Sequence, residues 1–170
     1  MTAAVIAHAG LVALRLHGLW RGVLLQGPSG AGKSDLALRA ISEGFRLIAD
    51  DRTVIFLSGG RLFGRAPSAV AGLIEVRGLG VVETRSLPLA EIVVAVRCTR
   101  QPDDVERMPR AESQPILGLA LPTLLLWPFE ASAPGKLRRA MLHLGEHRQQ
   151  AYQAARSSGA LPAEGGRWAL

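Results

Sequence analysis

Short apolar runs separated by turn residues predict most of this chain as β-strands. Clusters of valine, isoleucine and leucine place these strands at residues 3–16, 22–26, 45–49, 53–57, 61–65, 90–97 and 116–126. Residues 3–16 contain one or two strands. Residues 116–126 form one or two short strands, because Pro122 is incompatible with a helix interior.

Apolar residues recur at helical spacing in two segments. Residues 34–43 form the first predicted helix, closed by Gly44 as a left-handed cap. Residues 136–144 form the second, which could continue past Gly145. The pattern as a whole predicts an α/β domain: a mixed sheet with flanking helices and an added antiparallel β-hairpin over residues 53–65.

Length and composition favour one domain. A chain of 170 residues with 48% hydrophobic content can bury one sizeable core. The domain is expected over residues 1–156, followed by a mobile tail over 157–170, where glycine and proline are frequent. No apolar run approaches the roughly 18 residues of a membrane span, and residues 1–10 lack a secretion signal, so we expect a cytoplasmic protein with no membrane partner.

The charge balance bears on partners. Twenty Lys and Arg against fourteen Asp and Glu give a net charge of +6, which suits a phosphate-rich ligand or an acidic protein partner. The arginines are dispersed rather than interleaved with aromatics, so no nucleic-acid partner is expected. Cys98 is the single cysteine, which excludes an internal disulfide, and we expect it to be a small buried apolar residue.

One stretch fits the phosphate-loop pattern G-x-x-x-x-G-K-[ST] at every fixed position. It consists of Gly27, Pro28, Ser29, Gly30, Ala31, Gly32, Lys33 and Ser34. A predicted strand precedes it and a predicted helix follows, which is the context the motif requires. The glycines let backbone N–H groups turn inward around phosphates, Lys33 supplies a charge for the outer phosphates, and Ser34 would ligate Mg²⁺. The sequence therefore predicts a nucleoside triphosphate site.

Two adjacent acids follow the strand at residues 45–49. Asp50 and Asp51 come at its carboxyl end, where ligands collect in open α/β sheets, so both are expected beside the phosphate loop. One could hold Mg²⁺ and the other could accept a proton from an attacking hydroxyl. Adjacent side chains in an extended chain point opposite ways, so a turn beginning at Asp51 is needed to aim both at one phosphate.

Other candidates lie outside the loop. His8 and His17 flank the strand region that precedes it, and either could reach the phosphates if the connection folds back. Glu75 and Arg77 are two residues apart, so in one strand they would share a face. Glycines follow at 78 and 80, where backbone N–H groups could approach a phosphate or another chain.

These features in this order resemble the HPr kinase/phosphorylase family. The resemblance runs from about His8 to Val82 and is carried by His8-Ala9, the phosphate loop, the phrase Arg46-Leu47-Ile48-Ala49-Asp50-Asp51, and Glu75-x-Arg77-Gly78-x-Gly80-Val81-Val82. The family's additional N-terminal domain has no counterpart, so the chain resembles the form that consists of the catalytic domain alone.

The resemblance implies an ATP- and Mg²⁺-dependent protein kinase. Its substrate would be a serine of HPr, the phosphocarrier of the sugar phosphotransferase system, and it could also remove the phosphate by phosphorolysis, regulating carbohydrate metabolism. The implied fold is a phosphate-loop kinase domain related to phosphoenolpyruvate carboxykinase, assembled as a homohexamer.

The same resemblance assigns roles to residues. Lys33 and the loop amides would hold phosphates, while Ser34 and Glu75, with Asp50, are candidates for the Mg²⁺ shell. Asp51 or Asp50 would be the base toward serine and the acid in the reverse reaction. The family's histidine corresponds better to His8 than to His17. Arg77 would orient phosphate or the acidic pair. Two departures from the family are Asp35, where Glu is usual, and Pro134-Gly135-Lys136 in place of a Gly-Arg-Asn segment.

Two other functions are compatible with the residues. A small-molecule kinase of the shikimate or gluconate type matches the length and also places an acid after its second strand, but it predicts a lid with arginines and neither the hairpin nor the glycine pair. A non-catalytic ATP-sensing module would need the loop but not the two aspartates.

Overall fold

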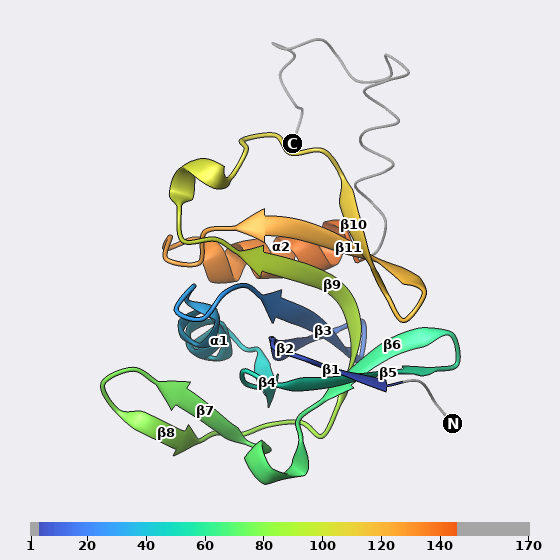
Figure 1. Cartoon of the computed structure of the whole chain (residues 1–170), viewed down its shortest axis with the longest axis vertical. Coiled ribbons are helices and arrows are strands. Elements are labelled where there is room, and N and C mark those ends of the chain that lie inside the picture. The colour runs from blue at the N-terminus through green and yellow to red at the C-terminus, as the bar shows by residue number, and fades with distance from the viewer. Residues whose placement is uncertain (1–3, 146–170) are drawn as a thin grey trace.

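The structure is a computed structural model that describes residues 4–145 of the chain (Figure 1). Its strands are β1 Ala4–Ala7, β2 Gly10–Leu16, β3 Leu19–Gln26, β4 Arg46–Ala49, β5 Thr53–Ser58, β6 Arg61–Arg65, β7 Leu73–Val76, β8 Gly80–Glu83, β9 Ala90–Cys98, β10 Glu112–Ile116 and β11 Leu119–Leu126. Its helices are α1 Lys33–Ser42 and α2 Ala133–His143. Short 3₁₀ turns occur at Ser68–Val70 and Pro102–Asp104.

The main sheet is mixed, as predicted. Its strand order is β1-β5-β6-β9-β3-β2-β4, and β11 with its hairpin partner β10 pairs with β9. Strands β3, β9 and β11 run parallel to one another, whereas the other pairings are antiparallel. β9 pairs with β6 near its start, with β3 along its length and with β11 near its end, so it lies in the interior of the sheet.

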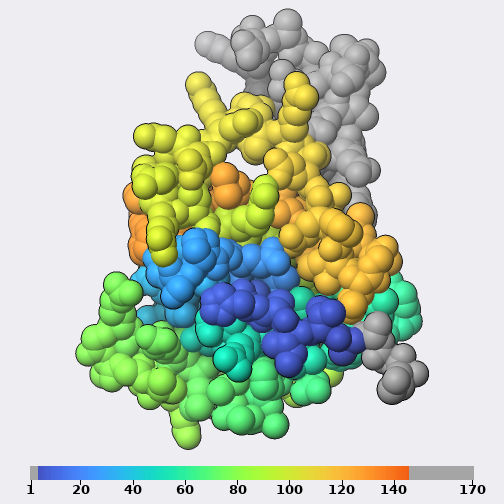
Figure 2. Space-filling view, viewed as in Figure 1, coloured from blue at the N-terminus to red at the C-terminus, as the bar shows by residue number. Residues whose placement is uncertain are grey.

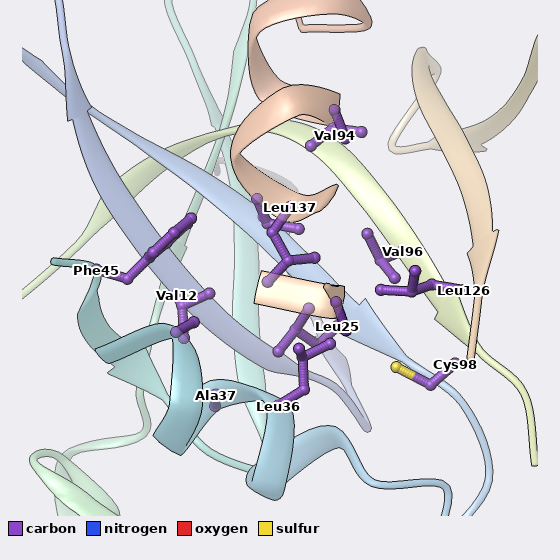
Figure 3. Packing of buried hydrophobic residues seen from close by; sticks show 14 of the residues in the cluster. Val12, Leu25, Leu36, Ala37, Phe45, Val94, Val96, Cys98, Leu126 and Leu137 are labelled. Carbon is purple, nitrogen blue, oxygen red and sulfur yellow. The ribbon is translucent and has the colours of Figure 1, made fainter. Parts of the chain in front are cut away.

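Alternating side chains divide the core between the two faces of the sheet. Val12 and Leu25 belong to the cluster that also contains the buried side chains of α1 and α2, so both helices cover one face (Figure 3). Leu11 and Leu24, one residue away, belong to a second cluster with residues of β5 and β6 on the other face. The fold is therefore built on two apolar layers that share the same strands.

Two glycines make the second layer possible. A Cβ on Gly64 would lie 2.4 Å from Leu11 Cδ2, and one on Gly22 would lie 2.9 Å from Leu11 Cδ1. Leu11 is fully buried between them. Because these glycines have no side chain, the large side chain of Leu11 in β2 fits against the curved face of the sheet.

The sheet has to curl, because β1 and β2 lie near opposite ends of the strand order although only two residues join them. β1 ends at Ala7 and β2 begins at Gly10, yet β1 pairs with β5 at the opposite end of the order. Thr53 Oγ1 at the start of β5 donates a 2.8 Å hydrogen bond to the carbonyl of Ala9. Residues 3–16 thus contain two strands, joined by a link of two residues.

Several local predictions are confirmed. The 53–65 hairpin forms with Gly59 and Gly60 at positive φ, and Gly44 is left-handed after α1. The 116–126 segment contains the strand β11, and its hairpin partner β10 begins earlier than the predicted segment, at Glu112. The continuation of the second helix past Gly145 and the mobile tail lie outside the described residues.

Residues 73–82 turn back as the β7–β8 hairpin, a separate two-stranded sheet that projects from the body of the molecule (Figure 1). Gly78 has φ 83° and Gly80 has φ 103°, values that permit the turn. Arg77 lies in that turn, so it does not share a strand face with Glu75.

Candidate active site

The strand directions bring the predicted motifs to one edge of the sheet. β2 lies between β3 and β4 and runs antiparallel to both, so β3 and β4 point the same way. β3 leads into the phosphate loop and β4 leads into the two aspartates. The Oγ of Ser34 donates a 2.8 Å hydrogen bond to Asp50 Oδ1, which joins the loop to the acids.

The phosphate loop depends on glycine at points of close approach. Gly27 has φ 141°, and a Cβ there would lie 2.6 Å from the carbonyl oxygen of Cys98. Gly32 has φ 88°, and a Cβ there would lie 2.8 Å from Phe129 Cζ. The loop is therefore wedged between the end of β9 and the segment that follows β11.

Lys33 lies inside this loop. It is only 6% exposed, and its Nζ donates hydrogen bonds to the carbonyls of Gly27 at 2.9 Å and Pro28 at 3.1 Å. Burial raises the pKa of the neighbouring Cys98 thiol to about 12, and the Lys33 charge offsets part of that rise. A positive charge held at the loop by backbone carbonyls is suited to bind phosphate.

The two aspartates have different partners because the chain turns between them. Asp51 has φ 63°, and the Arg52 N–H donates a 2.7 Å hydrogen bond to the carbonyl of Asp50. Asp50 uses its second oxygen, Oδ2, to accept a 2.9 Å hydrogen bond from the Glu75 backbone N–H. The expected turn at Asp51 is therefore present, and it fixes Asp50 between the loop and β7.

Asp51 faces the link between β1 and β2. His8 Nδ1 lies 3.2 Å from Asp51 Oδ1, and both side chains are about half exposed, at 54% and 57%. Figure 2 shows the dark-blue N-terminal segment on the open face of the molecule, below the lighter blue of the segment that follows it in the chain. The carboxylate of Asp51 can thus meet a substrate from solvent while an imidazole holds it.

His17 lies elsewhere. It occupies the turn between β2 and β3 with φ 48°, at the start of β3, whereas the phosphate loop follows the end of that strand. Eight residues of strand separate the two points, a span of roughly 25 Å. The expectation that either histidine could reach the phosphates is therefore wrong for His17.

Glu75 and Arg77 are only partly in contact with the other candidate site residues. The backbone of Glu75 reaches Asp50, but its side chain is exposed. Arg77 is exposed in the turn of the β7–β8 hairpin. A Cβ added at Gly78 or Gly80 in this turn would meet no atom within 4 Å. The hairpin glycines therefore do not pack against another part of residues 4–145.

Three residues near the loop were not predicted. The guanidinium of Arg100, just after β9, donates to the carbonyl of Ser29. Arg39 of α1 donates to the carbonyls of Pro128 and, at 3.2 Å, Glu130. Arg100 and Phe129 follow parallel strands, whose carboxyl ends meet at one edge of the sheet. Knowledge that β11 pairs with β9 would therefore have placed both residues near the loop.

The residues fit Mg²⁺ without forming a complete cage. No group of three or more His, Cys, Asp or Glu side chains suited to a metal occurs within the described part of the chain. Mg²⁺ typically takes one or two protein oxygens and completes its shell with water and substrate phosphates. The Ser34 hydroxyl and the Asp50 carboxylate, 2.8 Å apart, are such a pair.

A separate cavity of about 540 Å³ lies between the 104–112 loop, β11 and α2. Its rim carries Arg97, Arg139 and Lys136, and it includes none of the predicted site residues. Figure 2 shows an opening between the yellow segments in this part of the molecule. The phosphate loop and the acids are therefore on a surface distinct from this cavity.

Comparison with known proteins gives consistent results. A family model described as the HPr Serine kinase C-terminal domain matches residues 1–126. An HPr kinase/phosphorylase of Clostridium tetani is 45% identical over 78 residues, covering 43% of this chain and 26% of that protein. One of Bordetella pertussis is 39% identical over 117 residues, covering 62% and 38%. The chain thus spans well under half the length of these curated relatives.

A solved structure has the same fold. The HPr(Ser) kinase/phosphatase of Coxiella burnetii aligns with a TM-score of 0.70 at 21% identity, covering 90% of this chain and 97% of that one. Neither α1 nor α2 has the length and apolar character needed to cross a bilayer.

Proposed function

The chain belongs to the HPr serine kinase C-terminal domain family, and from this premise we propose that it transfers the γ-phosphoryl group of ATP to a serine of HPr. The observation that carries this proposal is the separation of two adjacent acids. Asp50 is tied to the phosphate loop through Ser34, while Asp51 is exposed beside His8. A nucleotide-binding module would need only the first of these arrangements.

The loop would hold the donor. Its amides and Lys33 would bind the β- and γ-phosphates, with Nζ exchanging carbonyl partners for phosphate oxygens. Ser34 and Asp50 would hold Mg²⁺, with Glu75 as a further candidate ligand. When bound, Mg²⁺ supplies positive charge that neutralises the phosphates during transfer. These groups position the γ-phosphorus toward the acids.

Asp51 would be the base. The serine oxygen of the substrate forms a bond to the γ-phosphorus, the bond from that phosphorus to the bridging oxygen of ADP breaks, and the serine proton passes to Asp51. His8 orients the Asp51 carboxylate through the 3.2 Å contact. A carboxylate can serve here because the proton leaves late, as the phosphoryl group is already transferring. In phosphorolysis, an oxygen of inorganic phosphate would form a bond to the phosphoserine phosphorus and the bond from that phosphorus to the serine oxygen would break. Pyrophosphate would leave, and Asp51 would pass the proton of the attacking phosphate to the serine oxygen.

We also propose the finer features that the family resemblance implies. These are a cytoplasmic location, assembly as a homohexamer, a relation of the fold to phosphoenolpyruvate carboxykinase, and a role for Arg77 in orienting phosphate or the acidic pair. Because Arg77 lies in an exposed turn, that role would require contact with the protein substrate or with a second copy.

The test is phosphoryl transfer to a purified partner. The protein is incubated with labelled ATP, Mg²⁺ and HPr, and the modified residue is mapped. Label on an HPr serine that disappears with Lys33→Ala is the expected result. ATP binding without label on HPr would favour the sensing module, and transfer to shikimate or gluconate instead would favour the small-molecule kinase; either would overturn the proposal.

A further inference from the structure

An exposed aromatic side chain lies beside the phosphate loop. Phe129 is 49% exposed, and it is the one aromatic among the large apolar residues exposed within residues 4–145. It follows β11, which is parallel to β3 and β9 and therefore ends at the same edge as the loop. The ring of Phe129 is therefore open to a ligand bound at the loop, to which it could present its aromatic face.

The position of Phe129 is fixed by three contacts. Its ring packs against Gly32, where even a methyl group would approach it to 2.8 Å. It makes an edge contact with Trp127, with ring centroids 6.2 Å apart at an interplanar angle of 65°. Arg39 holds the same segment through the carbonyls of Pro128 and Glu130. The ring is thus placed at the start of α1 and keeps half of its surface open.

The strand order sets the direction in which a bound nucleotide would lie. The phosphate loop follows β3, the acids follow β4 two strands to one side, and Phe129 follows β11 two strands to the other. Asp50 contacts the loop at Ser34 and the Phe129 ring contacts it at Gly32, so the acids and the ring lie against the loop from opposite sides. A triphosphate whose γ-phosphate reaches the acids therefore extends its base toward Phe129.

We propose that the Phe129 ring is the platform on which the purine base of the nucleotide stacks. This inference rests on the proposed nucleotide site, but not on transfer to HPr. Every base presents a π-face, so stacking on one aromatic ring strengthens binding with little discrimination among bases. Trp127 supports the ring from its edge, and the Arg39 contacts keep the segment in place.

The experiment compares ATP with inorganic tripolyphosphate, which has the phosphates but no base. Binding of each to the wild type and to Phe129→Leu is measured by titration calorimetry. Stacking on one aromatic ring corresponds to a loss of roughly five- to a hundredfold in affinity when the ring is removed. We expect that loss for ATP, with tripolyphosphate affinity unchanged within about twofold, and recovery in Phe129→Tyr.

Controls separate the alternatives. Phe56→Leu makes the same chemical change on the β5–β6 hairpin and should alter neither ligand. Equal weakening of both ligands by Phe129→Leu would show that Phe129 only shapes the loop, and unchanged ATP binding would show that the base lies elsewhere; each overturns the platform. Wild type that binds ATP but does not label HPr would refute the proposed function alone, whereas no ATP binding would refute both.

Discussion

At the scale of single residues, the main feature of the site is the left-handed conformation of Asp51. A non-glycine residue at φ 63° costs about 1–2 kcal/mol, which the surrounding contacts must offset. The conformation gives two neighbouring carboxylates different partners, Ser34 for Asp50 and His8 for Asp51. Backbone strain of this kind is typical of positions where geometry matters for chemistry.

Asp51→Asn should abolish transfer while leaving ATP affinity largely intact. The amide keeps the size of the side chain but cannot accept the serine proton, a contribution of roughly a hundredfold or more to the rate. Single-turnover labelling of HPr and ATP titration measure the two properties separately. Asp50→Asn is the matched variant and should weaken Mg²⁺-dependent ATP binding as well. Equal loss of binding and transfer in Asp51→Asn would instead assign Asp51 to the metal.

His8→Gln should lower kcat by about tenfold with little change in the KM for ATP. The histidine contacts Asp51 and lies off the phosphate loop, so its removal affects orientation of the base rather than nucleotide binding. His17→Gln, at the other end of β2, is the control and should leave both constants unchanged. A rise in the KM for ATP with unchanged kcat would contradict the role given to His8.

The raised pKa of Cys98 predicts that the folded protein loses stability at alkaline pH. Burial raises its pKa from an ordinary 9.0 to about 12, so the folded protein keeps the thiol proton that the unfolded chain loses. Its contribution is complete below about pH 9 and falls as the pH rises toward 12. Urea unfolding of wild type and Cys98→Ala across this range tests it: the stability advantage of the wild type should shrink with pH. A constant difference would show that the thiol titrates normally.

At the scale of elements, the two glycines around Leu11 show how close packing on one face of the sheet excludes larger residues at these positions. Gly64→Ala should lower the free energy of unfolding by about 1–3 kcal/mol, because the new methyl group would overlap a fully buried leucine. Gly135→Ala is the control: it has open space and a helical position, and should cost nothing or stabilise by up to about 1 kcal/mol. Denaturant melts compare the two, and a tolerated Gly64→Ala would show that Leu11 can repack.

Element-level prediction succeeded where the signals are local. The strand–glycine turn–helix context of residues 22–42, the 53–65 hairpin and the strand before Asp50 follow from glycine positions and short apolar runs, and all three form. For residues 73–82 the sequence left the conformation open, and the positive φ of Gly78 and Gly80 makes the segment a hairpin. The site role of Arg77 was implied by the family resemblance alone and remains a proposal.

At the scale of the whole molecule, the pairing of distant strands could not be inferred. The placement of β1 beside β5, and of β11 beside β9, depends on contacts between residues far apart in the sequence. Arg100 and Phe129 reach the loop only through this topology, so no spacing in the chain identifies them. The nearness of His8 to Asp51 likewise needs the curl of the sheet.

The pairing of β1 with β5 also implies a thermal response. β1 has four residues, three of them exposed, and within residues 4–145 it pairs with β5 alone, so its detachment should need far less free energy than global melting. Detachment would free His8 while the phosphate loop stays anchored by β3 and α1. Transfer to HPr should therefore fade reversibly on warming, at temperatures where calorimetry still finds an intact core and full ATP binding. Local unfolding of the amino-terminal edge strand would then inactivate the enzyme below the temperature at which the whole protein unfolds.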